Sequence, residues 1–381
     1  MKINKSILAA MLALGVAGIA SADDVYITGS TAMRSTIYNA LNTANVVFTN
    51  SVTFAGNGSG SGDSYMNFTG TLVGGSGTTT IHCHWSGSEA GVLDVASNSV
   101  VQETFLVTGA TGDSTNNTSY TSPVNVDLAL ADNAQTYSRT KSPTLTGTKI
   151  GVVTFEWVRN PGLWTGTNVT DNQIRQALGG AAPLAVFTGN SSDTGSFVYV
   201  EGRDNQSGTR VNTLGVSGYG IFTAVNQIEI NSSGVQQTVG GNYIGDFGFS
   251  SGGTLAGTLG ANTTSATDNT PNAGTGFSII AYLGISDATT AIGNGATALA
   301  YNGVPFSAAA VKEGTYNLWG NEYILKSPNA TGSALTAYNR LALLATKNTG
   351  VWAGLFDGVK AIHLADMHAS RVGPNSDISH N

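Results

Sequence analysis

The chain has 381 residues, of which only 10% are charged, and its net charge at pH 7 is −7. This acidic balance excludes nucleic-acid binding through a general positive field, while the length suffices for two lobes of ordinary domain size. The single cysteine, Cys83, excludes an intramolecular disulfide.

The N-terminus has the pattern of a secretory signal peptide. Lys2 and Lys5 precede an apolar run at 7–19, and Ala20-Ser21-Ala22 provides a small-residue cleavage site. The run is too short for a comfortable membrane span, and no later segment approaches that length. We therefore expect residues 1–22 to be removed, which leaves a periplasmic or secreted protein without a membrane span.

Strand–loop–helix units follow along the chain. Apolar periodicity and turn residues predict strands at 25–27, 46–53, 81–85, 100–107, 126–132, 149–157, 198–200, 277–285 and 317–326. Helices are expected around 33–41, after Ser88, at 171–178 with Thr170 as N-cap, after Ser207, and at 333–346 with Ser333 as N-cap. The Gly-, Ser- and Thr-rich stretch 55–80 predicts a β-hairpin insertion, and 108–124 a polar loop. The series indicates an α/β architecture.

Three of the predicted strand-to-helix turns share one design. Thr31, Ser88 and the segment Ser207-Gly208-Thr209 each place a hydroxyl group at a helix start that follows a strand. Unpaired N–H groups and the positive end of the helix dipole favour an anion at such a start. Arg203, just before the third turn, adds a planar set of donors that suits a tetrahedral oxyanion. The sequence therefore predicts anion capture.

A fourth predicted strand ends in Asp132. An ionised carboxylate only accepts hydrogen bonds, so it can accept one from a protonated phosphate but repels fully ionised sulfate. Asp132 among anion-binding donors therefore predicts selectivity for phosphate.

These segments resemble the phosphate-binding subunit of bacterial ABC transporters, a type II periplasmic binding protein. That family has a Gly-x-Thr-Phe turn, a Gly-Ser-x-Gly-Gly segment, a Ser-Asp at a strand end and an Arg-x-Asp-Gly-Ser-Gly-Thr loop. Four segments here look like these, in the same order: Gly29-Ser30-Thr31-Ala32, Gly87-Ser88-Glu89-Ala90-Gly91-Val92, Ala131-Asp132 and Arg203-Asp204-Asn205-Gln206-Ser207-Gly208-Thr209. Residues 316–325 look like the family's return strand to the first lobe.

The resemblance implies an α/β fold with the two-lobed type II periplasmic-binding-protein architecture, two hinge crossovers and β-rich insertions. Lobe one is expected at 23–155 and 306–381, and lobe two at 156–305. The implied function is capture of phosphate or a similar small oxyanion between the lobes, for uptake by an ABC transporter permease. The implied ligand-binding residues are Thr31, Ala32, Ser88, Asp132, Arg203, Ser207, Gly208 and Thr209.

The chain departs from the family pattern at two positions. Ala32 stands where the family has an aromatic residue, although its backbone N–H group is kept. Asn205 stands where the family has the aspartate that follows the arginine, so it supplies no charge beside Arg203. An alternative is therefore a surface or matrix protein that keeps the binding-protein fold without transport. A third interpretation is an all-β adhesin.

Other motifs carry little weight for function. His82 and His84 lie two residues apart, and His363 and His368 lie near Asp366, but we interpret both groups as surface residues and expect no metal site or cofactor. No catalysis is expected, because the serine of segment 87–91 lies one place early for a nucleophile elbow.

Overall fold

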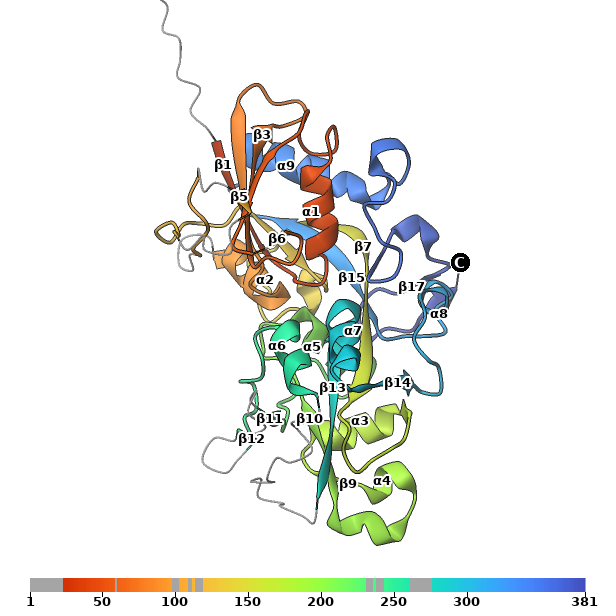
Figure 1. Cartoon of the computed structure of the whole chain (residues 1–381). Helices are drawn as coiled ribbons and strands as arrows, with labels where there is room; N and C mark the ends of the chain where they lie inside the picture. The colour runs from red at the N-terminus through yellow and green to blue at the C-terminus, as the bar shows by residue number, and fades with distance from the viewer. Residues whose placement is uncertain are drawn as a thin grey trace, which may run out of the picture.

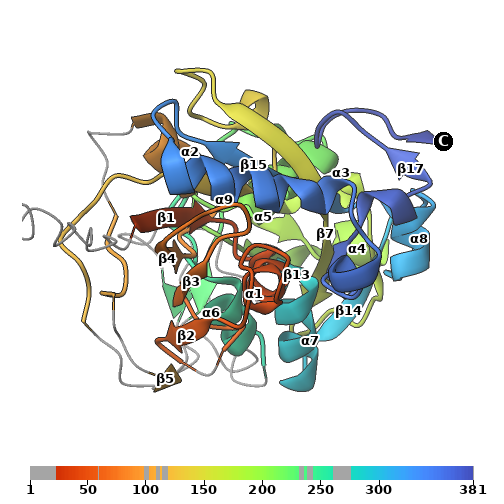
Figure 2. The same ribbon diagram turned by 90° about the horizontal axis from the view of Figure 1, so that it is seen from above.

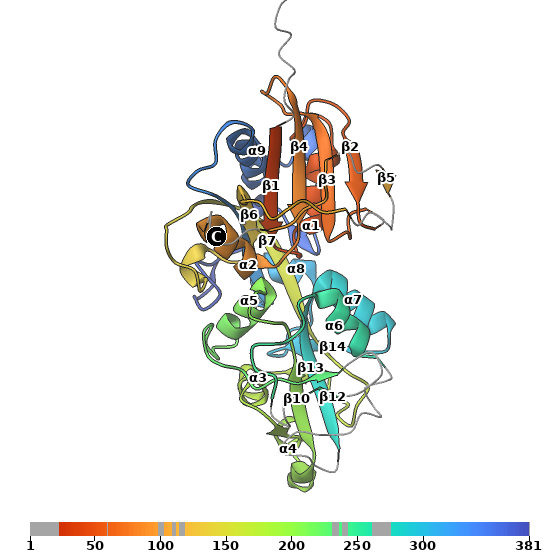
Figure 3. The ribbon, with the colours of Figure 1, turned by 90° about the vertical axis from the view of Figure 1, so that its left-hand side faces the viewer.

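The computed structural model describes residues 23–58, 60–97, 103–108, 112–113, 119–230, 236–237, 243–260 and 276–380. The predicted signal peptide at 1–22 lies outside these residues, as do parts of the predicted strand 100–107 and of the loop 108–124. The described residues form two lobes, drawn one above the other in Figure 1. A long strand, β7 (Thr146–Arg159), runs from the upper lobe, lobe one, into the lower lobe, lobe two (Figure 3).

The sheet of lobe one has the strand order β5-β2-β3-β4-β1-β6-β15-β7. Its strands are β1 (Asp23–Gly29), β2 (Thr53–Gly56), β3 (Tyr65–Thr71), β4 (Thr78–His84), β5 (Gly112–Asp113), β6 (Leu128–Ala131) and β15 (Trp319–Lys326). β1 pairs in parallel with β4 and β6, as strand–helix–strand connections require. β3 pairs antiparallel with β2 and β4, which confirms the hairpin predicted within 55–80.

Alternate residues of these strands face helices on opposite sides of the sheet. In β6, Leu128 and Leu130 belong to the core that includes α1 (Arg34–Asn42) and α9 (Gly332–Ala342). Ala129 and Ala131 belong to a second core with α2 (Ser88–Ser97). Burial on both faces explains why 126–131 contains almost no polar side chain. Figure 2 shows α9 lying along lobe one, where it packs on β1, β15 and β7.

Lobe two repeats this layered plan. Its strands are β8 (Asn168–Val169), β9 (Ala182–Pro183), β10 (Phe197–Glu201), β13 (Phe277–Gly284) and β14 (Thr297–Tyr301). Its helices are α3 (Asp171–Leu178), α4 (Ala185–Thr188), α5 (Gly208–Val216), α6 (Gly252–Thr258) and α7 (Ile285–Gly293). Along β10, Val198 and Val200 face the core that includes α3 and α5, whereas Tyr199 faces the core that includes α6 and α7.

The lobes are joined where β7 changes its partner. Thr154 pairs with Trp319 of β15, whereas Phe155 pairs with Gly284 of β13. The chain returns to lobe one between β14 and β15, through α8 (Ala308–Lys312). The predicted boundaries of lobe two, 156 and 305, adjoin these places and stay a prediction.

The C-terminal segment contacts both lobes. β16 (Ala361–Ile362) pairs with β7, and β17 (Ala369–Ser370) pairs with β18 (Ser379–His380). Pro374, between β17 and β18, packs tightly on α5. A Cβ atom added at Gly215 of α5 would lie 2.7 Å from the Cβ atom of Pro374. A short β11–β12 pair (Glu229–Ile230 and Gln236–Gln237) completes the described strands.

Two predicted strands are wrong within the described residues. Val46, Val47 and Phe48 are buried, but their segment consists of turns and bends around Asn45, whose φ is 65°, with an isolated bridge from Phe48 to Leu72. Apolar residues here fill the core from a loop, which periodicity does not distinguish from a strand. In 103–108 the chain makes isolated bridges at Glu103 and Leu106 and no strand.

Three smaller predictions are also corrected. The N-cap of α9 is Thr331, and the Ser333 hydroxyl instead donates a hydrogen bond to Asp23. His82 and His363 are buried rather than exposed, at 0% and 3%. The described residues contain no group of side chains that could hold a metal ion. Cys83, next to His82 in β4, is fully buried.

Candidate functional site

The turns that precede α1 and α2 depend on glycines with a positive φ. At Gly29, φ is 115° and a Cβ atom would lie 2.0 Å from the Leu130 carbonyl oxygen. At Gly87, φ is 107° and a Cβ atom would lie 2.8 Å from the Gln206 carbonyl oxygen. Only glycine fits such positions, so these residues set where β1 and β4 end and where the helices begin.

Ser88, Asp132 and Gly208, all predicted site residues, meet where the two lobes touch. A Cβ atom at Gly208 would lie 2.3 Å from the Ser88 Oγ atom and 2.7 Å from Asp132 Oδ2. The Asp132 amide donates to Ser88 Oγ at 3.1 Å, and the Ser30 hydroxyl donates to Asp132 Oδ1. The Glu89 amide of α2 donates to the Gln206 carbonyl at 2.9 Å. We call Ser88, Asp132 and Gly208 the contact cluster; these residues contact one another directly and leave no space between them.

A buried glutamate, which the sequence analysis missed, lies beside Asp132. Tyr323 of β15 pairs with Ala131 of β6, so the next residues along, Glu322 and Asp132, are cross-strand neighbours. Burial, and then the charge of Asp132, holds the pKa of Glu322 well above its usual range. The charge of Asp132 disfavours ionisation of Glu322, as expected for two adjacent buried carboxyl groups. The signal in the sequence was a glutamate next to the apolar run Tyr323-Ile324-Leu325.

Arg203, a predicted anion ligand, uses two of its three side-chain nitrogen atoms elsewhere. It is 3% exposed, and its Nε and Nη2 atoms donate to the carbonyl oxygens of Phe249 and Ser250 at 3.0 and 2.7 Å. Ser207 is the N-cap of α5, as predicted, and its hydroxyl accepts a hydrogen bond from the Arg210 amide at 3.3 Å. Thr209 is buried in the first turn of α5.

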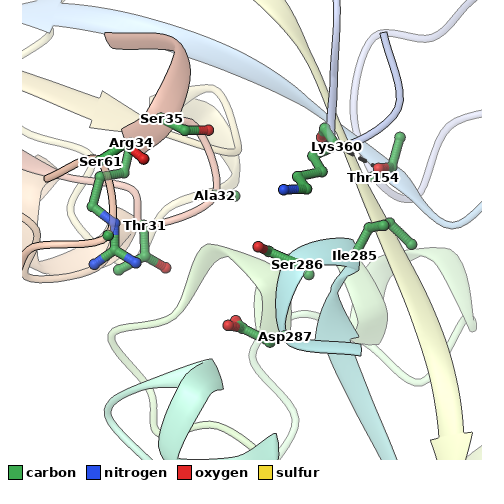
Figure 4. A pocket seen from close by; sticks show the side chains of 12 residues that line it. Thr31, Ala32, Arg34, Ser35, Ser61, Thr154, Ile285, Ser286, Asp287 and Lys360 are labelled. Carbon is green, nitrogen blue, oxygen red and sulfur yellow. Dashed lines mark hydrogen bonds between the residues drawn. The ribbon is translucent and has the colours of Figure 1, made fainter. Parts of the chain in front are cut away.

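A cavity of about 130 Å³ lies between the lobes (Figure 4). Lobe one supplies the start of α1, and lobe two supplies the start of α7, opposite it. The cavity is lined by Thr31, Ala32, Arg34, Ser35, Ser61, Gly62, Thr154, Gly284, Ile285, Ser286, Asp287 and Lys360. Thr31 and Ala32 were predicted as site residues, although the Ala32 amide donates to Ser30 Oγ at 3.2 Å.

Three charged residues dominate the electrostatics of the cavity: Arg34, Asp287 and Lys360. Burial raises the pKa of Asp287, and the positive charges of Arg203, Arg34 and Lys360 act in the opposite direction. A Cβ atom at Gly252 would lie 2.1 Å from Asp287 Oδ2 and 3.4 Å from Arg203 Nη1, so Asp287 and Arg203 flank one glycine. Asp287 thus supplies near Arg203 the negative charge that Asn205 lacks.

Sequence reasoning missed all three of these residues. Asp287 had a signal, because an aspartate in the first turn of a helix after an apolar strand favours the helix dipole. Arg34 follows the first predicted turn by three positions and was within reach of the same argument. Lys360 lies in a segment without periodicity, so only the folded chain places it at the cavity.

Comparisons with known proteins find the same architecture. No family model matches the chain, and no curated protein matches it. A solved structure of a putative phosphate ABC transporter substrate-binding protein with bound phosphate, from Clostridium perfringens, matches with a TM-score of 0.50 and 13% identity over 90% of this chain and 100% of that chain. An ABC-type phosphate transport receptor from Vibrio cholerae matches with a TM-score of 0.44 and 13% identity over 89% and 99% of the two chains.

The chain therefore has the two-lobed α/β fold of type II periplasmic binding proteins, as predicted. The resemblance to phosphate-binding subunits, first seen in four short motifs, is confirmed at the level of the fold. No helix among the described residues has the length and apolar character needed to cross a membrane.

Proposed function

We propose that the protein is an exported solute-binding protein that captures phosphate or a similar small oxyanion between its two lobes. The observation that carries this proposal is the cavity between the lobes. In a chain with a net charge of −7, two cationic side chains, Arg34 and Lys360, and the starts of two helices converge on it. Neither helix has a side-chain cap, so their first N–H groups remain available to an anion.

The position of the cavity fits ligand-driven closure. An anion held by α1 from one side and α7 from the other gains contacts only when the lobes are close together. Binding of this kind shifts the equilibrium toward the closed form by the difference in affinity. The Clostridium perfringens protein, which shares the fold, carries bound phosphate, and this supports phosphate as the first ligand to test.

Uptake through an ABC transporter permease, and a periplasmic or secreted location, form part of the same proposal. The two neighbours described above are named as transport components, and the predicted signal peptide supports export. We propose no catalytic activity.

Calorimetric titration of the mature protein tests the proposal. The protein is first unfolded and refolded to remove bound anions, its fold is checked by circular dichroism, and phosphate and then sulfate are titrated. We expect binding of one phosphate per chain and much weaker binding of sulfate. Absence of heat with both anions, from a folded protein, would contradict the proposal.

One observation favours the alternative, a surface or matrix protein that keeps the fold without transport. Ser88, Asp132 and Gly208 are in direct contact, and Arg203 donates from Nε and Nη2 to the carbonyl groups of Phe249 and Ser250, so these motif groups already have partners. A folded protein without affinity for either anion would favour this alternative over the proposed function.

A further inference from the structure

We infer that the oxyanion binds in the cavity itself, held by Arg34 and Lys360, and that Asp287 accepts the proton of a singly protonated ligand. This inference rests on the proposed function and locates its site at residues outside the four motifs. The ligand class is a tetrahedral oxyanion that keeps one proton near neutral pH, of which inorganic phosphate is the simplest.

Three charged groups of the cavity lining remain available to a ligand. Arg34 makes one long hydrogen bond, 3.4 Å from Nη1 to the Asp63 carbonyl oxygen. The ion pairs within the described part of the chain involve other residues, so Arg34, Lys360 and Asp287 face the cavity without a close ionic partner. An unpaired guanidinium and an unpaired ammonium group on one cavity are a natural site for an anion.

Hydrogen bonds hold the backbone of Lys360 in place. Its amide donates to Asp357 Oδ1 at 2.8 Å, and its carbonyl oxygen accepts from the Thr154 amide at 3.1 Å and from the Thr154 hydroxyl at 3.2 Å. The backbone is therefore fixed on β7, at the junction of the lobes, while the side chain extends toward Ser286 and Asp287 (Figure 4). Because this backbone is fixed on β7, the distance from the Lys360 ammonium group to Ser286 and Asp287 depends on how close the two lobes lie.

The contact cluster offers an anion fewer available groups than the cavity does. The Asp132 carboxylate already accepts a hydrogen bond from Ser30, and Gly208 covers its second oxygen. Arg203 has donated to two carbonyl groups. An anion that entered there would have to separate groups that already satisfy one another, whereas the cavity offers donors without such a cost.

The charges of the cavity lining suit an oxyanion that carries one proton. Two positive charges and one carboxylate leave the lining with a small positive excess, which favours an anion over a neutral solute. The Asp287 carboxylate can only accept, so it pairs with the O–H group of hydrogen phosphate and repels sulfate, which has no proton to donate. Asp287 thus takes the discriminating role that the sequence assigned to Asp132.

The test is calorimetric titration of inorganic phosphate and sulfate into six single variants. Arg34→Ala and Lys360→Ala should each weaken phosphate binding by about tenfold or more, as expected for loss of a charge-assisted hydrogen bond. Asp287→Asn should weaken phosphate binding and strengthen sulfate binding. Asp132→Asn should leave the preference between the two anions as in the parent. Arg340→Ala and Lys347→Ala, which remove cations outside the cavity lining, serve as matched controls and should bind phosphate as the parent does.

A footprint of Lys360 complements the variants and needs no mutation. Lys360 is exposed, so an amine-acetylating reagent should modify it, and saturating phosphate should slow this modification while leaving Lys347 unaffected. The rates are read by mass spectrometry of peptides.

The results separate the two proposals. If the parent binds phosphate but the Arg34, Lys360 and Asp287 variants bind it equally well, while Asp132→Asn loses the preference over sulfate, the inference is wrong and the proposed function stands. If the folded parent binds neither anion, both are wrong. Binding that depends on Arg34 and Lys360, with the preference set by Asp287, establishes the inference.

Discussion

Glu201, the last residue of β10, is a carboxyl group buried without a cation. It is 0% exposed and accepts hydrogen bonds from the Ile230 amide and, at 3.2 Å, from the Thr258 hydroxyl. Burial raises its pKa from 4.5 to about 8. Because the folded state holds the proton more tightly than the unfolded state, this contribution to stability is complete below pH 4.5 and is lost as the pH rises through 8.

Replacing Glu201 by glutamine should therefore change how stability depends on pH. Glutamine keeps an acceptor for the Ile230 amide and does not ionise. The variant therefore avoids the loss of unfolding free energy, about 1.4 kcal/mol per pH unit, that the parent undergoes as the pH rises from 4.5 to about 8. We expect Glu201→Gln to unfold at higher denaturant concentration than the parent at pH 8 and at similar concentration at pH 5. Urea titrations at the two pH values measure this. Glu313→Gln, at an exposed position, is the control, and equal shifts in both variants would contradict the assignment.

Among single residues, those at strand-to-helix turns could be predicted and those that depend on tertiary contacts could not. The N-cap role of Ser207 was predictable because the cap and the amide that it accepts from are three residues apart. The contact of Gly208 with Ser88 follows from the meeting of two lobes, about which the local sequence holds no information. Glu322 and Lys360 acquire their meaning only through β15 and β7, which are neighbours in space.

Among the elements, helices with local signals were predicted best. α3 begins and ends as predicted, because Thr170 and Gln173 form a capping box and Gly179 follows the last residue. The predicted strand 46–53 failed because its apolar residues fill the lobe-one core from turns. Periodicity measures which residues are buried, and burial alone does not fix the backbone conformation.

The capping box of α3 leads to a prediction on stability. Thr170→Ala removes the acceptor for the Gln173 amide, so it should lower the free energy of unfolding by about 1 kcal/mol. Thr336→Ala is the control, since Thr336 lies within α9 and its hydroxyl bonds back to the Gly332 carbonyl oxygen; alanine there should be neutral or slightly stabilising. Chemical denaturation measures both variants. Equal losses in the two would show that the cap of α3 has no special importance.

For the whole molecule, the two-lobed plan was predictable from the order of four motifs, although the neighbour that establishes the fold is only 13% identical. The C-terminal segment was not predictable, because its short strands are held by β7 and by α5 rather than by their own periodicity. Since Pro374 packs on α5 of lobe two and β16 pairs with β7, separation of the lobes has to move this segment as well.

Cys83 offers a measure of how the whole molecule unfolds. The thiol is fully buried in β4, and burial raises its pKa, so both access and thiolate formation are suppressed. We expect no reaction with a disulfide reagent in the folded protein, with or without phosphate, and complete reaction in guanidinium chloride at the concentration where ellipticity is lost. Reaction at a constant rate under native conditions would mean that lobe one opens locally around β4.

The burial of this one thiol also makes the protein ready for use as an optical sensor. Reagents that attach dyes to cysteine would find no target in the folded chain, so one cysteine introduced on the rim between the lobes would carry the only fluorophore. Its fluorescence emission would follow the approach of the lobes in real time. Candidate ligands could then be screened by the change in emission that they cause.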